Sequence, residues 1–71
     1  MNSQPRIDDL LVLETASVRE ALQCIDENAQ GICVVTDSSG RLVGVATDGD
    51  IRRGLLSGVE LGDPVSSVMT S

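Results

Sequence analysis

Short apolar blocks divide the chain, and three of them have the length and composition of β-strands. Residues 10–13, Leu-Leu-Val-Leu, form an apolar run that predicts a short buried strand. Residues 32–36 and 42–46 are rich in β-branched side chains, and residues 32–36 predict a strand buried on both faces. The intervening residues 37–41 contain turn-forming side chains and Gly40, which can supply a positive φ. The pattern therefore predicts an antiparallel hairpin preceded by one further strand.

Two other blocks repeat apolar residues at helical spacing. The first follows Ser17-Val18-Arg19-Glu20, which has the S-x-x-E form of a capping box. The apolar face predicted for this helix consists of Val18, Ala21, Leu22, Ile25 and Ala29. Gly31 is suited to a left-handed position where the helix ends. A second helix is expected over residues 50–56 after an N-cap at Thr47 or Asp48, with an apolar face of Ile51, Leu55 and Leu56.

The predicted order is β-α-β-β-α, an α/β (α+β) fold with a small sheet and two helices on one face. We expect residues 1–9 to be a lead-in, residues 10–61 to form the domain, and residues 62–71 to be a linker. The sheet face that the helices leave uncovered would expose Val34, Val43, Val45 or their neighbours. Monomers rarely expose such a patch, so a two-fold homodimer is expected to bury it.

Composition and charge narrow the class of protein. The 71 residues are 41% hydrophobic but include no aromatic residue, so the core is small and a second copy or domain is expected to cover apolar surface. The net charge of −6 disfavours binding to nucleic acid or to an anionic membrane surface. The sequence contains no membrane-spanning run and no signal-peptide pattern at its N-terminus, which predicts a cytoplasmic protein with reduced thiols.

One segment carries a specific resemblance to a known family. Residues 44–50, Gly-Val-Ala-Thr-Asp-Gly-Asp, resemble the G-h-h-T/S-x-x-D signature of the cystathionine-β-synthase-type (CBS) domain. Residues 17–22 are similar to that family's first helix. Val34 and Val35, followed by Asp37 and Gly40, are similar to its central hairpin. The resemblance covers roughly residues 11–56 and implies a regulatory β-α-β-β-α module.

The C-terminal residues extend the resemblance. Residues 63–70 look like the V-x-x-V-M-T segment that precedes a CBS repeat, and family members usually carry two repeats packed as a (Bateman) module. We therefore expect this chain to be a fragment of a longer protein that pairs with another CBS repeat, here as a homodimer. Residues 47–53 also resemble CBS segments attached to sugar-phosphate isomerases and sugar-phosphate nucleotidylyltransferases.

The resemblance implies a ligand, an adenine nucleotide such as AMP, ADP or ATP. A helix N-terminus attracts phosphate, and an acidic residue in its first turn can accept hydrogen bonds from the two ribose hydroxyls. On this basis Asp50 is expected to hold the ribose and Thr47 to contact ribose or phosphate. The resemblance places Thr15, Ala16 and Ile32 beside the base.

Structural interpretations of the same residues remain open. Thr47 or Asp48 fits a plain N-cap, and Arg53 lies at ion-pair spacing from Asp50 as well as within reach of a phosphate. Asp48-Gly49-Asp50 resembles a metal-binding D-x-D but has no third carboxylate nearby in sequence, so no metal is expected. The alternative function is a purely structural dimerisation element without ligand, attached to a sugar-phosphate-processing enzyme.

Catalysis by this chain alone is not expected. The chain has no histidine to activate Cys24, Cys33 or a serine, and both cysteines are expected to be small buried hydrophobes. We therefore predict no catalytic residues, no cofactor and a binding role rather than an enzyme.

Overall fold

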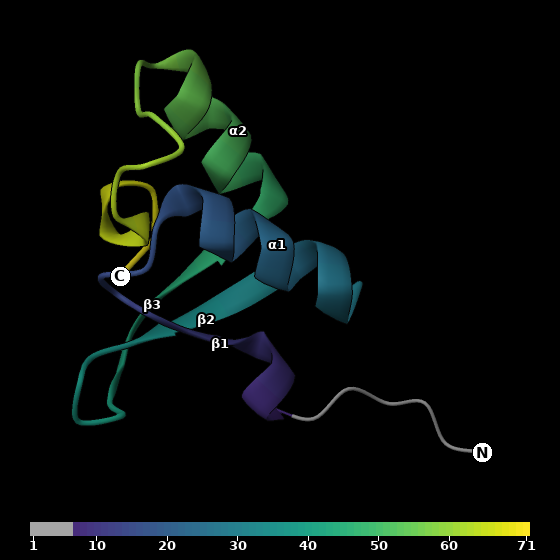
Figure 1. Ribbon diagram of the computed structural model, residues 1–71, viewed down its shortest axis with the longest axis vertical. Helices are drawn as coiled ribbons and strands as arrows, with labels where there is room; N and C mark the ends of the chain where they lie inside the picture. The colour runs from purple at the N-terminus through teal and green to yellow at the C-terminus, as the bar shows by residue number, and fades with distance from the viewer. Residues whose placement is uncertain (1–6) are drawn as a thin grey trace.

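The computed structural model describes residues 7–71, and its helices and strands follow the predicted β-α-β-β-α order (Figure 1). Residues 1–6 of the predicted lead-in lie outside the described residues. The elements are β1 (Leu11–Leu13), α1 (Val18–Asn28), β2 (Ile32–Thr36), β3 (Leu42–Thr47) and α2 (Asp48–Leu56), with 3-10 turns at Ile7–Leu10 and Val65–Ser67. The α+β fold class is confirmed. No helix within residues 7–71 has the length and apolarity needed to cross a membrane.

The three strands form one sheet in the order β1-β2-β3. β1 runs parallel to β2, which is possible because α1 supplies the crossover, and β2 pairs antiparallel with β3. The predicted hairpin turn is present, and Gly40 adopts a φ of 84° in it. Both helices lie on the same face of the sheet, as Figure 1 shows.

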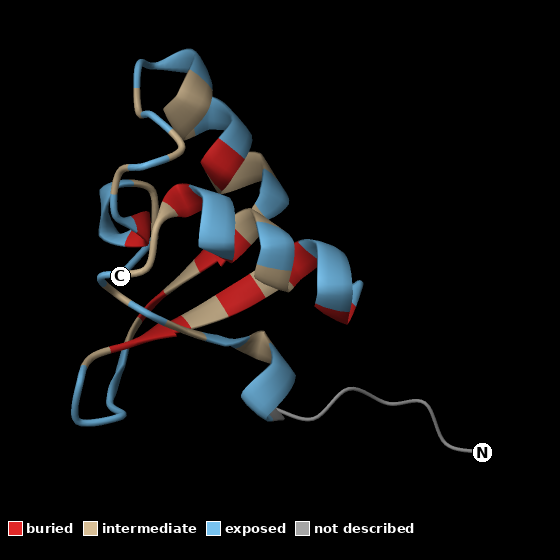
Figure 2. Cartoon of the chain, viewed as in Figure 1, coloured by how far each residue is buried: buried red, intermediate tan, exposed pale blue. Residues whose placement is uncertain are grey.

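The core lies between the helices and the sheet and is built from small side chains. Its buried hydrophobic residues are Val18, Ala21, Ile25, Cys33, Val35, Ala46, Ile51 and Val65. β2 contributes Cys33 and Val35 and β3 contributes Ala46, and buried and half-buried positions alternate along most of both strands (Figure 2). The helices therefore cover one face of the sheet, and neither helix covers the opposite face.

Because one face of the sheet is uncovered, β1 and β2 are less buried than the sequence predicts. Leu11 and Leu13 are 38% and 51% exposed, so the expectation that β1 is buried is wrong for this chain. β1 is an edge strand, and the register places Leu11 in one row with Val34 and Val45. Val34 is half-buried rather than enclosed on both faces, because no helix covers it.

A shift in strand pairing removes Val43 from the apolar patch predicted on the uncovered face. The pairing shifts between Val35 and Thr36, so that Thr36 lies opposite Leu42 and Val43 is skipped. Val43 consequently packs against the core, whereas Leu42 is 65% exposed. The uncovered sheet face therefore carries two rows, one of Leu11, Val34 and Val45, and a second in which the exposed Leu13 and Leu42 flank the buried Thr36.

Three details at the helix ends also differ from prediction. Ala29 is exposed and forms the left-handed C-cap of α1 with a φ of 59°, while the polar Asn28 is buried on the face assigned to Ala29. Gly31 has a positive φ of 76°, but two residues beyond this cap. Leu56 is 83% exposed because the apolar stripe of α2 passes through Ile51 and Leu55, one helical turn apart.

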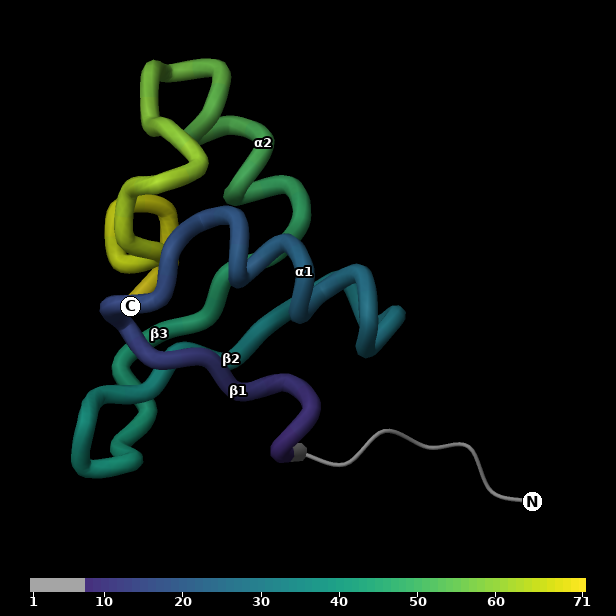
Figure 3. The backbone as a smooth tube through the Cα atoms, in the orientation of Figure 1, coloured from purple at the N-terminus to yellow at the C-terminus, as the bar shows by residue number. Residues whose placement is uncertain are grey.

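The C-terminal segment returns to the domain and supplies backbone partners to α1 and β3 (Figure 3). The first two N–H groups of α1, those of Val18 and Arg19, donate to the carbonyls of Asp63 (2.8 Å) and Leu61 (3.0 Å). Further along, Thr70 and Val45 exchange two backbone hydrogen bonds of 2.8 Å beside the edge of β3. Residues predicted as a linker thus lie on this domain.

Two glycines, Gly44 and Gly54, allow the C-terminal segment to approach β3 and α2 closely. A Cβ on Gly44 would lie 2.8 Å from the Thr70 carbonyl oxygen and 2.9 Å from the Met69 sulfur. A Cβ on Gly54, in the middle of α2, would overlap the Val68 side chain. The close approach therefore explains why α2 contains a glycine despite its poor helix propensity.

We expect Gly54→Ala to destabilise the domain by about 1–3 kcal/mol, although alanine is the better helix former, because overpacking displaces Val68. Gly49→Ala in the same helix is the matched control, since its nearest neighbour, Arg53, would lie at an ordinary 3.5 Å. That variant should be neutral or more stable by up to about 1 kcal/mol. Urea unfolding measures both. Stabilisation by Gly54→Ala would contradict the docked position of the C-terminal segment.

Candidate functional site

The junction between β3 and α2 is held by reciprocal hydrogen bonds between Thr47 and Asp50. The Thr47 hydroxyl oxygen accepts from the Asp50 N–H at 3.0 Å, and the Thr47 N–H donates to Asp50 Oδ2 at 3.0 Å. This is a complete capping box, and Thr47 is the N-cap. A second capping box, between Ser17 and Glu20, begins α1 as the sequence predicts.

The two helix N-termini differ in what remains free. In α1 the carbonyls of the C-terminal segment occupy the first N–H groups. In α2 the Asp48 N–H donates to the Gly31 carbonyl at 3.1 Å, but the Gly49 N–H has no acceptor among residues 7–71. The N-terminus of α2 therefore keeps an unused N–H donor at the positive end of its dipole, whereas in α1 the first two N–H groups are engaged.

The Asp50 carboxylate lies beside this position and is charged. Its side chain is only 16% exposed, with Oδ2 bonded to the Thr47 N–H and Oδ1 2.6 Å from Arg53 Nη2. The hydrogen bond from the Thr47 backbone, aided by the Thr47 and Arg53 side chains, lowers the pKa of Asp50 below its ordinary 3.8. Asp50 is therefore ionised at neutral pH, so both of its carboxylate oxygens act as hydrogen-bond acceptors.

The other predicted ligand-binding residues lie at both ends of the sheet. Ile32 begins β2 and pairs directly with Thr47, although its carbonyl already accepts from the Asn28 side chain at 3.2 Å. Thr15 and Ala16 follow β1 at the opposite end, because β1 is parallel to β2. A five-residue strand separates the two groups by about 13 Å. One chain thus brings Ile32, Thr47 and Asp50 together but not Thr15 and Ala16.

Asn28 is a structural polar residue that the sequence analysis missed. It is 7% exposed, its amide nitrogen reaches the Asp9 and Ile32 carbonyls, and its side-chain oxygen accepts from the Gln30 N–H at 2.7 Å. It therefore joins α1 to both β2 and the residues before β1. The signal was available, since Asn28 follows Val18, Ala21 and Ile25 at helical spacing.

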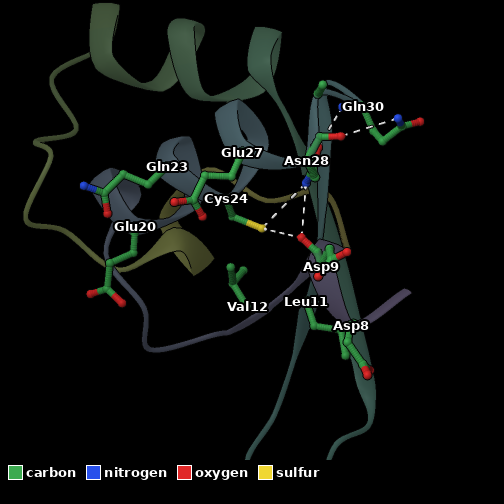
Figure 4. A pocket seen from close by; sticks show the side chains of 11 residues that line it. Asp8, Asp9, Leu11, Val12, Glu20, Gln23, Cys24, Glu27, Asn28 and Gln30 are labelled. Atoms are coloured by element: carbon green, nitrogen blue, oxygen red, sulfur yellow. Dashed lines mark hydrogen bonds between the residues drawn. The ribbon is translucent and has the colours of Figure 1, made fainter. Parts of the chain in front are cut away.

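A groove between β1 and α1 is chemically unsuited to phosphate (Figure 4). Among residues 7–71, the side chains that line it include four acidic residues and no basic residue: Asp8, Asp9, Glu20 and Glu27. Like charges would repel an anionic ligand. Cys24 also lines the groove, and desolvation raises its pKa, so its thiol is neutral rather than nucleophilic. Burial raises the pKa of Cys33 to about 11.

The Asp48-Gly49-Asp50 motif is engaged in ion pairs rather than arranged as a metal site. Arg52 Nη2 lies 3.2 Å from Asp48 Oδ2, and Arg53 holds Asp50 as described. Within residues 7–71, no group of three or more histidine, cysteine or acidic side chains is placed to hold a metal ion.

Comparison with known proteins points to one family. Residues 5–57 match the CBS domain. The chain is 40% identical over 68 residues to arabinose 5-phosphate isomerase GutQ of Shigella flexneri, covering 93% of this chain and 21% of that protein. It is also 41% identical over 56 residues to arabinose 5-phosphate isomerase KdsD of Yersinia pestis, covering 78% and 17%. The chain therefore spans about a fifth of the length of these curated relatives.

Solved structures agree. The CBS domain protein PAE2072 from Pyrobaculum aerophilum, complexed with AMP, superposes with a TM-score of 0.81 at 26% identity, covering 100% of this chain and 53% of that one. The CBS-domain containing protein ATU1752 from Agrobacterium tumefaciens gives 0.79 at 28% identity, covering 86% and 47%. With its fold, its β3–α2 signature and the match over residues 5–57 in agreement, this chain belongs to the CBS domain family.

Proposed function

We propose that this CBS domain is a regulatory module that binds an adenine nucleotide (AMP, ADP or ATP) at the N-terminus of α2. The observation that carries the proposal is the free Gly49 N–H flanked by the Thr47 hydroxyl and the charged Asp50 carboxylate. A phosphate would accept from the Gly49 N–H, and ribose hydroxyls would donate to Asp50. The AMP complex of the Pyrobaculum aerophilum relative supports an adenine nucleotide as the ligand.

A second CBS repeat would complete the site. Thr15 and Ala16 lie at the opposite end of the sheet from Thr47 and Asp50 of the same chain, whereas those of a partner repeat could lie beside the ligand. The apolar rows of the uncovered sheet face supply the surface for such pairing. In this proposal residues 10–61 are the repeat and residues 62–71 lead toward a second one.

The relatives suggest what the module regulates. GutQ and KdsD are arabinose 5-phosphate isomerases, and this chain matches about a fifth of each. The proposed role is therefore nucleotide sensing beside a sugar-phosphate-processing catalytic domain. The chain itself would bind and not catalyse. Its alternative role is a dimerisation element without ligand.

Nucleotide binding is tested by thermal unfolding with and without AMP. At about ten times the dissociation constant, a ligand that binds only the folded state adds about 1.4 kcal/mol of stability, a shift of several degrees in so small a domain. Asp50→Ala should lower affinity by about 1.5–3 kcal/mol and reduce the shift at the same AMP concentration to about a quarter or less. Thr47→Ala should lower the ligand-free melting temperature, since a lost N-cap costs about 0.5–2 kcal/mol.

The capping box of α1 provides the matched control. Glu20→Ala weakens a helix cap of the same kind without touching the α2 N-terminus or the residues proposed to contact the ligand, so it should retain the AMP shift. Absence of any wild-type shift with AMP, ADP and ATP would favour the dimerisation element. An undiminished shift in Asp50→Ala would show that the nucleotide binds elsewhere.

Pairing through the sheet face is tested by sedimentation equilibrium at about 50 µM, where we expect twice the monomer mass. Leu42→Asp should return the chain to a monomer, because a charge on the uncovered face must be desolvated in the dimer. Leu56→Asp adds the same charge to a leucine that is also exposed but lies on α2, and it should remain dimeric. A monomeric wild type, or equal effects of the two variants, would contradict this interface.

A further inference from the structure

The Arg53 side chain is exposed, yet its guanidinium folds back over the first turn of α2. Its Nη2 is 2.6 Å from Asp50 Oδ1, and its Nη1 would be 3.5 Å from a Cβ on Gly49. The absence of a side chain at Gly49 leaves this space open. Arg53 therefore contacts the carboxylate proposed to hold ribose and lies next to the residue whose N–H is free to bind phosphate.

The two oxygens of Asp50 are held with unequal strength. Oδ2 accepts from the Thr47 backbone N–H, and losing that bond would open the capping box. Oδ1 is held by a side chain that is 73% exposed, and exposed ion pairs are weak. A ligand hydroxyl that needs an oxygen of Asp50 can therefore displace Arg53 from Oδ1 more readily than it can displace Thr47 from Oδ2.

We propose that Arg53 exchanges Asp50 for the ligand's phosphate when a nucleotide binds, and so makes the site selective for 5′-phosphorylated nucleosides. A ribose hydroxyl takes over Asp50 Oδ1, and the released guanidinium pairs with the phosphate beside Gly49. A nucleoside without phosphate would displace Arg53 and offer it no new partner. This inference rests on the proposed function and names the residue that distinguishes nucleotide from nucleoside.

The neighbouring ion pair offers a control of equal charge. Arg52 pairs with Asp48 at 3.2 Å, and both side chains are well exposed, at 70% and 53%. Neither residue is hydrogen-bonded to Thr47 or Asp50. Arg52→Gln therefore removes the same charge from the same helix without changing the contacts of Asp50.

The test compares AMP with adenosine by chemical-shift titration of the wild type, Arg53→Gln and Arg52→Gln. Arg53→Gln should bind AMP about tenfold more weakly, having lost a charge-assisted phosphate contact. It should bind adenosine about twofold to fivefold more tightly, because Asp50 Oδ1 is already free. The preference for AMP would fall by about twentyfold or more, while Arg52→Gln should change the two affinities by less than about twofold.

Each other outcome has a distinct meaning. Equal changes in AMP and adenosine affinity in Arg53→Gln would overturn the exchange but leave nucleotide binding at α2 intact. The same loss of preference in Arg52→Gln would reduce the effect to net charge and also overturn it. A wild type that binds neither ligand would overturn the exchange and the proposed function together.

Discussion

The hydrogen bonds between Thr47 and Asp50 fix the point at which β3 becomes α2, and both the packing and the proposed chemistry depend on that point. Ile51, the next residue, is fully buried in the core, so the cap sets the helix rotation that brings it there. The same cap orients the Asp50 carboxylate and leaves the Gly49 N–H at the helix end. A structural cap and a ligand site are therefore alternatives only in part, because here one set of atoms can serve both.

Small side chains impose the second constraint. With no aromatic residue, the core relies on close approach, and the C-terminal segment supplies Val65 and the backbone carbonyls that close the N-terminus of α1. Gly44 and Gly54 allow that approach. Closing α1 in this way leaves α2 as the helix whose N-terminus is open, which relates the fold of residues 61–70 to the location of the proposed site.

Local patterns were sufficient for the elements and insufficient for their burial. The Ser17 capping box and the Gly40 turn each depend on a few adjacent residues, and both are confirmed. Exposure of Leu13 and the inward position of Val43 depend on which strand lies at the edge and on a register shift. Those features arise from pairing between distant segments, which no local pattern contains.

The candidate site likewise has features that the local sequence predicts and features that only the folded structure shows. Thr47 and Asp50 lie within one short motif, so their proximity follows from the sequence. That Ile32 joins them while Thr15 and Ala16 lie at the far end of the sheet follows only from the strand directions. The free Gly49 N–H is likewise a property of the assembled fold, since it depends on which carbonyls approach each helix end.

The most direct test of the central claim is an amide chemical-shift map of the ¹⁵N-labelled chain titrated with AMP. The account predicts the largest shifts at Gly49 and Asp50, with a change at the Arg53 side chain. Shifts concentrated in the acidic groove, at Gln23 and Glu27, would contradict it. So would a spectrum that millimolar AMP leaves unchanged.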